Sequence, residues 1–350
     1  MKHQTNTKSC TKKLNQQQKQ FSYVPYFEYS QQKHEVIWAL SLNQQKTLLF
    51  AATKENVKVK QFKNGRLRGL QKIKMHSQDV TTMNILKSRS QYISGSFDST
   101  ICIGSQYLMS NPKYITKLKQ HSQWVSCVIL HPILEDQLMS GSSDLNIQIW
   151  SWNSFLQSWF CSQTICEHQG QIFSMSINQE GNQFISCATD QSILVMESSE
   201  KRTWQVKQKI KVNQWGFRLS FINNKIFVFQ PSEQNNWHGS KNIHFYQFNS
   251  SSNQYVISQE IQVKGGGYPC YCYFPQIYIP SKQILLSKNG HFVNLIQLTY
   301  SPTSHLECNY QQNIDCKCEI TTGTMSEDGE FLIIFNIDTK KIQIRKFQLQ

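Results

Sequence analysis

The segment HSQWVSCVILHPILEDQLMSGSSDLNIQIW, residues 121–150, determines the fold expected for this 350-residue chain. It begins with a histidine and contains two stretches in which apolar and polar residues alternate, one before and one after Ser140 and Asp144. Alternation with a period of two is typical of β-strands. Residues 76–103 and 168–195 repeat the same order, and each has a serine four residues before an aspartate. A repeat unit built from short strands predicts an all-β architecture.

The repeat extends along the whole chain when the last alternating stretch of each copy serves as a marker. Its first apolar residue recurs every 44 to 50 residues, at Val57, Ile101, Ile147, Ile193, Ile243, Val293 and Ile342. Seven copies at this spacing predict a seven-bladed β-propeller with four strands in each blade. A polar insertion, residues 231–241, accounts for the extra length of the fifth copy.

The seventh copy supplies only three strands before Gln350. The strand-like segment FSYVPYFEYS, residues 21–30, is left over before the first copy. We therefore expect residues 21–30 to complete the last blade and close the ring, which leaves no exposed sheet edge. Residues 1–20 are expected to form a disordered basic tail, and residues 21–350 the propeller.

Composition narrows the classes of function. No apolar run approaches the roughly 18 residues of a membrane span, and none follows the first methionine. Eleven scattered cysteines without a secretory signal predict free thiols in a reducing compartment. We expect the cytoplasm, with the nucleus as the alternative. A formal charge of +14 suits nucleic acid, acidic proteins or anionic lipid as partners.

Four residues in the third copy carry a family resemblance: His121, Ser140, Asp144 and Trp150. They stand where WD40 repeats have a hydrogen-bonded tetrad, and the chain resembles that family. The resemblance implies that the tryptophan bonds the serine, the serine the histidine and the histidine the aspartate. A buried aspartate needs such a partner.

The second and fourth copies keep three of the four tetrad positions, namely His76, Ser94 and Asp98, and His168, Ser186 and Asp190. Gly104 and Met196 replace the tryptophan in these copies. The other four copies lack most of the tetrad, and in the first copy Lys54 and Lys60 occupy the aspartate and tryptophan positions. We expect those blades to be held by apolar packing and backbone pairing alone.

Serine, histidine and aspartate also form hydrolytic triads, but a set repeated at matching positions indicates a structural role. No phosphate-binding loop or other catalytic motif appears. We therefore expect no enzymatic activity and no cofactor. One further group in the last two blades carries side chains that can bind a metal: Cys270, Cys272, His305, Cys308, Cys316 and Cys318. Zinc sites more often use longer spacers on turns, so buried thiols are the preferred interpretation.

The run VKVKQFKNGRLRGLQKIK, residues 57–74, is strongly basic. We interpret it as a solvated strand face, with contact to an anionic partner as the alternative. RNA-binding surfaces normally add aromatic rings on which bases stack. Phe62 is the only aromatic residue within the run, so the run alone offers little support for RNA binding.

The family resemblance also implies which loop residues face the upper rim of the ring. Carried over to this chain, these positions are Asp79, Thr81, Phe97, Trp124, Ser126, Ser143, Gln171, Phe173 and Thr189. We expect a protein partner to contact six of them: Asp79, Phe97, Trp124, Ser143, Gln171 and Phe173. Three are aromatic and lie on adjacent blades, and clustered exposed aromatic residues are typical of recognition sites.

The sequence thus favours a scaffold for protein–protein interaction, a monomeric ring within a larger assembly. One alternative is the WD40 subunit of cytosolic iron–sulfur protein assembly, which resembles this chain in SFDSTICI, residues 96–103. Another is an RNA-associated propeller, suggested by the net charge.

Overall fold

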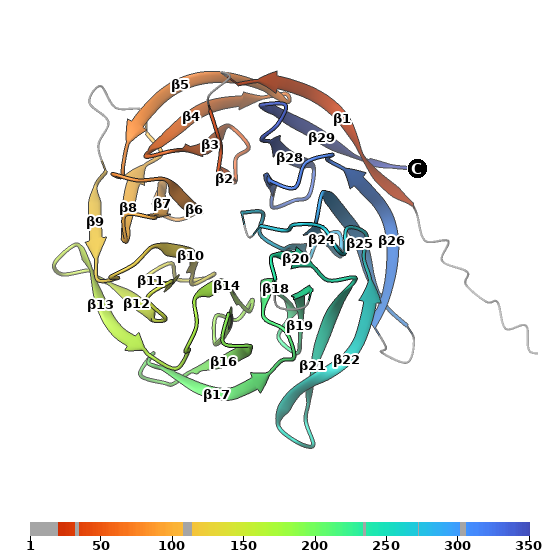
Figure 1. Ribbon diagram of the computed structural model, residues 1–350. Helices are drawn as coiled ribbons and strands as arrows, with labels where there is room; N and C mark the ends of the chain where they lie inside the picture. The colour runs from red at the N-terminus through yellow and green to blue at the C-terminus, as the bar shows by residue number, and fades with distance from the viewer. Residues whose placement is uncertain (1–19, 32–34, 108–113, 234–235, 272, 302–305) are drawn as a thin grey trace, which may run out of the picture.

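The computed structural model describes residues 20–31, 35–107, 114–233, 236–271, 273–301 and 306–350. Its strands form seven separate antiparallel sheets around a central axis (Figure 1). The predicted seven-bladed β-propeller is therefore confirmed. The expected tail lies outside the described residues, apart from Gln20. Within the described ranges no helix is long and apolar enough to cross a membrane.

The first four blades follow one another along the chain, each with its innermost strand first. Blade one contains β2 (Ala39–Leu42), β3 (Leu48–Thr53), β4 (Asn56–Lys63) and β5 (Arg66–Lys74). Blade two contains β6 (Val80–Leu86), β7 (Gln91–Ser96), β8 (Thr100–Ser105) and β9 (Thr116–Lys119). Blade three contains β10 (Val125–Leu130), β11 (Gln137–Ser142), β12 (Ile147–Asn153) and β13 (Ser158–Ile165). Blade four contains β14 (Ile172–Ile177), β15 (Gln183–Ala188), β16 (Ser192–Ser198) and β17 (Trp204–Lys211).

The last three blades include one additional short strand and the closing strand. Blade five contains β18 (Gly216–Asn223), β19 (Ile226–Glu233), β21 (Asn242–Asn249) and β22 (Gln254–Gln262), and β20 (His238–Gly239) pairs with β19. Blade six contains β23 (Ile277–Ile279), β24 (Ile284–Asn289), β25 (Phe292–Tyr300) and β26 (Leu306–Asp315). Blade seven contains β27 (Thr321–Met325), β28 (Phe331–Asn336), β29 (Lys341–Leu349) and β1 (Phe21–Ser30).

The seven marker residues all lie in the third strand of their blade, from Val57 in β4 to Ile342 in β29. Apolar side chains on both faces of each sheet pack against the neighbouring blades. The rings of Phe50 and Tyr92, for example, meet between blades one and two with centroids 4.8 Å apart. The core is therefore a ring of interfaces between blades.

Strand β1 closes the ring, as the sequence predicts. It pairs antiparallel with β29, from Phe21 opposite Leu349 to Ser30 opposite Lys341. The register shifts just after Pro25, which suits a residue that has no amide proton to donate. Tyr23 is fully buried, and its hydroxyl donates to the Gly329 carbonyl at 2.6 Å.

Replacing Tyr23 with alanine should lower the free energy of unfolding by about 3–5 kcal/mol, because the change removes a buried ring and its hydrogen bond. Tyr26→Ala on the same strand is the matched control, since that side chain is 40% exposed. Urea unfolding followed by tryptophan fluorescence measures both variants. Equal loss of stability in the two would contradict closure through β1.

Candidate functional site

The tetrad of blade three joins three parts of the fold through one chain of hydrogen bonds. The indole nitrogen of Trp150 donates to Ser140 Oγ at 2.9 Å, and Ser140 Oγ lies 2.8 Å from His121 Nε2. The other ring nitrogen, Nδ1, is 2.8 Å from the Asp144 carboxylate. This carboxylate also accepts the backbone amide of Ser122 at 2.9 Å. The loop leading into the blade is thereby fixed to the turn between its second and third strands.

Hydrogen bonds to the carboxylate control its ionisation. Burial raises the pKa of Asp144, but the hydrogen bond and charge of His121 and the amides of Ser122 and Asn146 outweigh burial. The net effect is a pKa below the ordinary range. The carboxylate is therefore charged in the folded protein and holds its partners as an acceptor.

Blades two and four contain the same arrangement without the tryptophan. His76 lies 2.9 Å from Ser94 Oγ and 3.1 Å from Asp98, and the corresponding distances from His168 to Ser186 and Asp190 are 2.8 and 3.0 Å. In blade two the ring of Tyr92 crosses the space above Gly104, where a β-carbon would lie 2.4 Å from it. Tyr92 therefore explains why glycine replaces the tryptophan.

The three tetrad serines cannot act as nucleophiles on an external substrate. Ser94, Ser140 and Ser186 are fully buried inside their sheets. A nucleophilic serine must instead meet its substrate and a set of oxyanion donors. The tetrads therefore stabilise the fold.

The expectation that the remaining blades are held by apolar packing and backbone pairing alone is wrong. Arg218 in β18 is 1% exposed, and its guanidinium donates to the carbonyls of Tyr271 and Phe274. One Nη atom also donates to Cys270 Sγ at 3.1 Å. A buried cation needs such acceptors, so Arg218 fixes the loop between blades five and six.

Blade six has its own substitute for a tetrad. The Asn294 side chain accepts the backbone amide of Lys264 at 3.0 Å and donates to the Lys264 carbonyl at 3.1 Å. It also donates to the Ser287 carbonyl at 3.2 Å. One amide side chain therefore joins the loop leading into the blade to its second strand, as histidine and aspartate do elsewhere.

The upper face of the ring consists of the loops that lead into each blade and the turns between second and third strands. A backbone hydrogen bond joins loop to turn in four consecutive blades. The bonds run from Phe97 to Asp79, Ser143 to Trp124, Thr189 to Gln171 and Ser232 to Trp215, at 2.7 to 3.0 Å. The residue just before the first strand is therefore held at the rim in every one of these blades.

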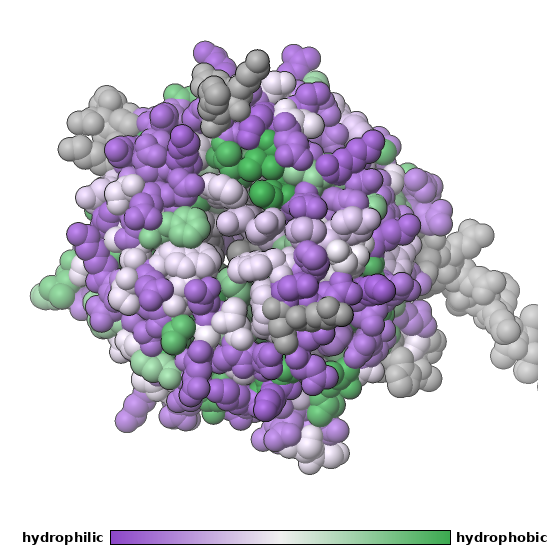
Figure 2. Space-filling model, viewed as in Figure 1, coloured by the Kyte–Doolittle hydropathy of each residue, from purple (hydrophilic) through white to green (hydrophobic). Residues whose placement is uncertain are grey.

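An aromatic belt surrounds the central opening of this face. It consists of Trp38, Phe97, Trp124, Phe173, Trp215, Trp237, Tyr271 and Tyr273. Neighbouring rings lie 4.6 to 6.5 Å apart between centroids. The Trp38 indole donates to the Asp79 carboxylate at 2.8 Å, which completes the circuit back to Phe97. In Figure 2, which looks onto this face, residues of intermediate hydropathy border the opening.

The structure places only some of the predicted contact residues at the surface. Asp79, Phe97, Trp124 and Gln171 are half-buried at the rim. Phe173 is 3% exposed because Trp124, Trp215 and Trp237 cover it, so its expected exposure is wrong. Ser143 is also buried.

The neighbouring hydroxyl positions have other roles. Thr81 is buried and donates to the Val125 carbonyl of the next blade, and Ser126 donates to the Ile172 carbonyl in the same way. Thr189 is half-buried and accepts the Gln171 amide at 2.9 Å. Thr81 and Ser126 therefore join adjacent blades beneath the rim, and Thr189 joins loop to turn within blade four.

Sequence reasoning missed five members of the belt: Trp38, Trp215, Trp237, Tyr271 and Tyr273. They belong to blades without tetrads, so the family pattern did not locate their loops. One signal was available, because Trp38, Trp124 and Trp215 each immediately precede the first strand of a blade. Trp237, in the polar insertion, is 44% exposed and offers the most accessible ring of the belt.

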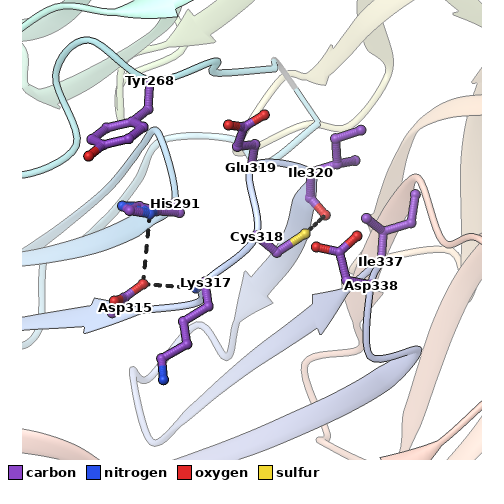
Figure 3. Close-up of a pocket in the computed structure, with 9 residues that line it drawn as sticks. All are labelled: Tyr268, His291, Asp315, Lys317, Cys318, Glu319, Ile320, Ile337 and Asp338. Carbon is purple, nitrogen blue, oxygen red and sulfur yellow. Dashed lines mark hydrogen bonds and ion pairs between the residues drawn. The ribbon is translucent and has the colours of Figure 1, made fainter.

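A pocket of about 480 Å³ lies between blades six and seven (Figure 3). Asp315, Glu319 and Asp338 line it, together with Cys318. The Cys318 thiol donates to the Ile320 carbonyl at 3.3 Å, and burial raises its pKa. Burial therefore favours the neutral thiol of Cys318 over the thiolate.

Cys270, Cys316 and Cys318 all lie within electrostatic reach of the buried Lys288 ammonium. Cys270 is fully buried against the Arg218 cation, which disfavours a metal ion beside it. Cys272 and His305 lie outside the described residues. Among the residues that the structure does describe, no three histidine, cysteine, aspartate or glutamate side chains are grouped to hold a metal.

A seven-bladed ring in which hydrogen-bonded His, Ser and Asp side chains join loops to turns is typical of a WD40-type propeller. The family model "WD domain, G-beta repeat" matches residues 112–151 and 159–195, which cover the third and fourth repeats. The two matched repeats and the seven-bladed ring support the WD40-repeat family for this chain.

Curated relatives share the name "p21-activated protein kinase-interacting protein 1-like". The protein from Danio rerio is 28% identical over 144 residues, which is 40% of this chain and 37% of that protein. The protein from Xenopus laevis is 25% identical over 183 residues, which is 52% of this chain and 40% of that protein. The chain thus spans about two fifths of the length of these relatives. The iron–sulfur assembly alternative stays an untested prediction.

Replacing Asp144 with alanine should lower the free energy of unfolding by about 1–3 kcal/mol, because His121 and two backbone amides lose a buried acceptor. Asp338→Ala is the control, since Asp338 is exposed on a turn of blade seven. The two variants are compared by their urea unfolding midpoints. Equal midpoints would contradict the role given to the tetrad.

Acidification should abolish the contribution of Asp144 to the free energy of unfolding. The pKa of Asp144 is lower in the folded protein than its ordinary value of 3.8, so its stabilisation is complete above that value. It is lost progressively as the pH falls below about 4. The stability difference between the wild type and Asp144→Ala should therefore shrink between about pH 7 and about pH 3. An unchanged difference across this range would count against a charged, hydrogen-bonded Asp144.

Proposed function

We propose that this chain is a non-catalytic scaffold that binds protein partners on its upper face, with the aromatic belt at the centre of the contact. The observation that carries this proposal is a continuous set of rings around the opening, several of which remain partly exposed. Tryptophan and tyrosine dominate the energy of protein interfaces because they bury large areas with few rotatable bonds.

The rigidity of the belt supports the same function. Tetrads fix the loops that carry Phe97 and Trp124, and the buried guanidinium of Arg218 fixes the loop that carries Tyr271 and Tyr273. Preorganised side chains lose less entropy when a partner binds. The belt is thus suited to tight binding without rearrangement.

The names of the relatives suggest a first candidate partner, a p21-activated protein kinase. We propose that a kinase of this class docks on the belt, with the Asp79 carboxylate available to orient a basic residue. The cytoplasm, or alternatively the nucleus, is the proposed location, and a monomeric ring the proposed state of the chain within its assembly.

Trp237→Ala and Trp124→Ala should each weaken binding of a purified p21-activated kinase about 30-fold, the equivalent of about 2 kcal/mol. Phe155→Ala is the control, because Phe155 is 92% exposed on the turn between β12 and β13, far from the belt. Biolayer interferometry measures the affinities, and thermal melting verifies that each variant is folded.

The Trp124 ring is half-buried, so Trp124→Ala can also lower the melting temperature. In that case the affinity of Trp237→Ala decides whether the kinase binds the belt. Folded Trp237→Ala protein with wild-type affinity would mean that the kinase uses another surface. No binding by the wild type would exclude this kinase class as the partner.

A further inference from the structure

Strand β1 of blade seven and strand β5 of blade one lie side by side at the outer edge of the ring (Figure 1). Ring closure brings them together, because β1 comes from the start of the chain and completes the last blade. A groove lies between them. Two pockets mark its course, of about 360 Å³ near the upper face and about 590 Å³ near the turn between β4 and β5. We call it the seam groove.

Cations line the seam groove from end to end. Three lysines line the upper pocket, and a lysine and two arginines line the lower one: Lys58, Lys60, Lys72, Lys63, Arg66 and Arg68. Glu35 is the single acidic residue that lines either pocket among the described residues, and it is paired with Lys58. The groove is therefore strongly positive, and its field favours a polyanion.

Lys60 shows that this charge is more than a solvated strand edge. It lies on the inner neighbour of the edge strand, is 5% exposed, and makes no ion pair with any described carboxylate. Its ammonium sits over the Tyr29 ring, 4.6 Å from the centroid. Burial lowers its pKa and the neighbouring Lys58 lowers it further, while the Glu35 carboxylate opposes both effects. A buried cation that makes no direct ion pair costs free energy that a bound anion would recover.

The structure also supplies the aromatic rings that the basic run lacks in the sequence. Tyr26, Phe27 and Tyr29 project from β1 along the groove. Arg66 lies over the Phe27 ring at 5.5 Å, and Tyr26, which packs on the turn at Gly65, keeps 40% of its surface exposed. Aromatic rings interleaved with cations are the usual platform for unpaired bases.

We propose that the seam groove binds single-stranded RNA, with phosphates along the cations and a base stacked on Tyr26. The exposed amide side chains of Gln61 and Asn64 line the lower pocket and can bond the 2′-hydroxyl that distinguishes RNA from DNA. From Arg66 to Lys72 the strand extends about 20 Å, enough for several nucleotides. This surface lies at the outer edge of the ring, so RNA and a partner on the belt can bind together.

A basic outer strand also has a purely structural explanation. Lysines on an edge strand prevent aggregation with the sheets of other molecules. Strand β17 of blade four is such an edge, with exposed Lys209 and Lys211. Edge protection accounts for Lys72 equally well, but not for buried Lys60 or for the rings of β1. Strand β17 therefore provides a control with matched charge.

The test measures binding of a fluorescein-labelled 12-nucleotide oligouridylate to the full chain by fluorescence anisotropy over a salt series. Arg66→Gln/Arg68→Gln should weaken binding at least tenfold and reduce the slope of log K against log salt by about 1.4, since each phosphate contact contributes about 0.7. Lys209→Gln/Lys211→Gln, with the same loss of charge, should change affinity less than twofold. Equal losses of RNA affinity in the two double variants would mean that binding depends only on the net charge of the protein, and this result would overturn the proposal.

Two further variants separate a binding role from a structural one. Lys60→Met keeps the packed stem and removes the buried charge, so it should weaken RNA binding while the urea midpoint stays the same or rises. Tyr26→Leu should weaken binding to RNA without changing the salt slope, because it removes stacking and no charge. If Lys60→Met is less stable and binds RNA as tightly as the wild type, Lys60 stabilises the fold and does not contact RNA.

Competitors identify the ligand class. Double-stranded RNA of equal charge should compete less well than oligouridylate, and oligothymidylate should bind more weakly than oligouridylate. Vesicles containing phosphatidylserine should not displace the RNA. Absence of RNA binding at low salt, or binding to the vesicles in its place, would overturn the proposal in favour of a lipid surface or no ligand.

Discussion

The pairing of β1 with β29 is the interaction on which the rest of the molecule depends. Each blade buries its apolar faces only against its two neighbours, so an open ring would expose the faces of blades one and seven. The closing strand also carries Tyr23 into the core between blades six and seven. The same strand brings Tyr26 and Tyr29 beside the basic strand of blade one, so closure produces both the core and the seam groove.

The blades reach similar rigidity by different chemistry. Blades two to four use a histidine between a serine and an aspartate, whereas blade five uses the buried Arg218 and blade six an asparagine. All of these devices join a loop of the upper face to backbone or side-chain groups inside a sheet. A polar group buried for this purpose must find its partner, which ties the loop to one position. Among the described residues, blades five and six therefore hold upper loops in place even though their repeat sequences have diverged.

The strands were predictable because alternation and spacing are local properties, and the position of β1 followed from counting strands. The tetrads were predictable because His121, Ser140 and Asp144 stand where the resemblance to WD40 repeats implies hydrogen-bonded partners. The belt was predictable only in part. Whether a ring such as Phe173 points outward depends on Trp215 and Trp237, which come from another blade and have no repeat pattern.

Contacts between distant segments could not be obtained from the sequence. Lys60 stands at a tetrad tryptophan position and appeared to be one more cation of a basic strand. Its burial against Tyr29 arises because residues 31 positions apart meet only after the ring has closed. In the same way, Arg218 gave no signal in its own repeat, because its acceptors belong to the loop that follows blade five.

Closure can be tested most directly by amide hydrogen exchange, followed by mass spectrometry of peptides from β1 and β29 in the native protein. Because the amides of β1 that face β29 are hydrogen-bonded and the strand buries Tyr23, these amides should be protected far above the level of an unfolded segment, although β29, which also pairs with β28, should be protected more strongly. Exchange of residues 21–30 at the rate of an unfolded segment, while β29 remains protected, would contradict ring closure and with it the seam groove.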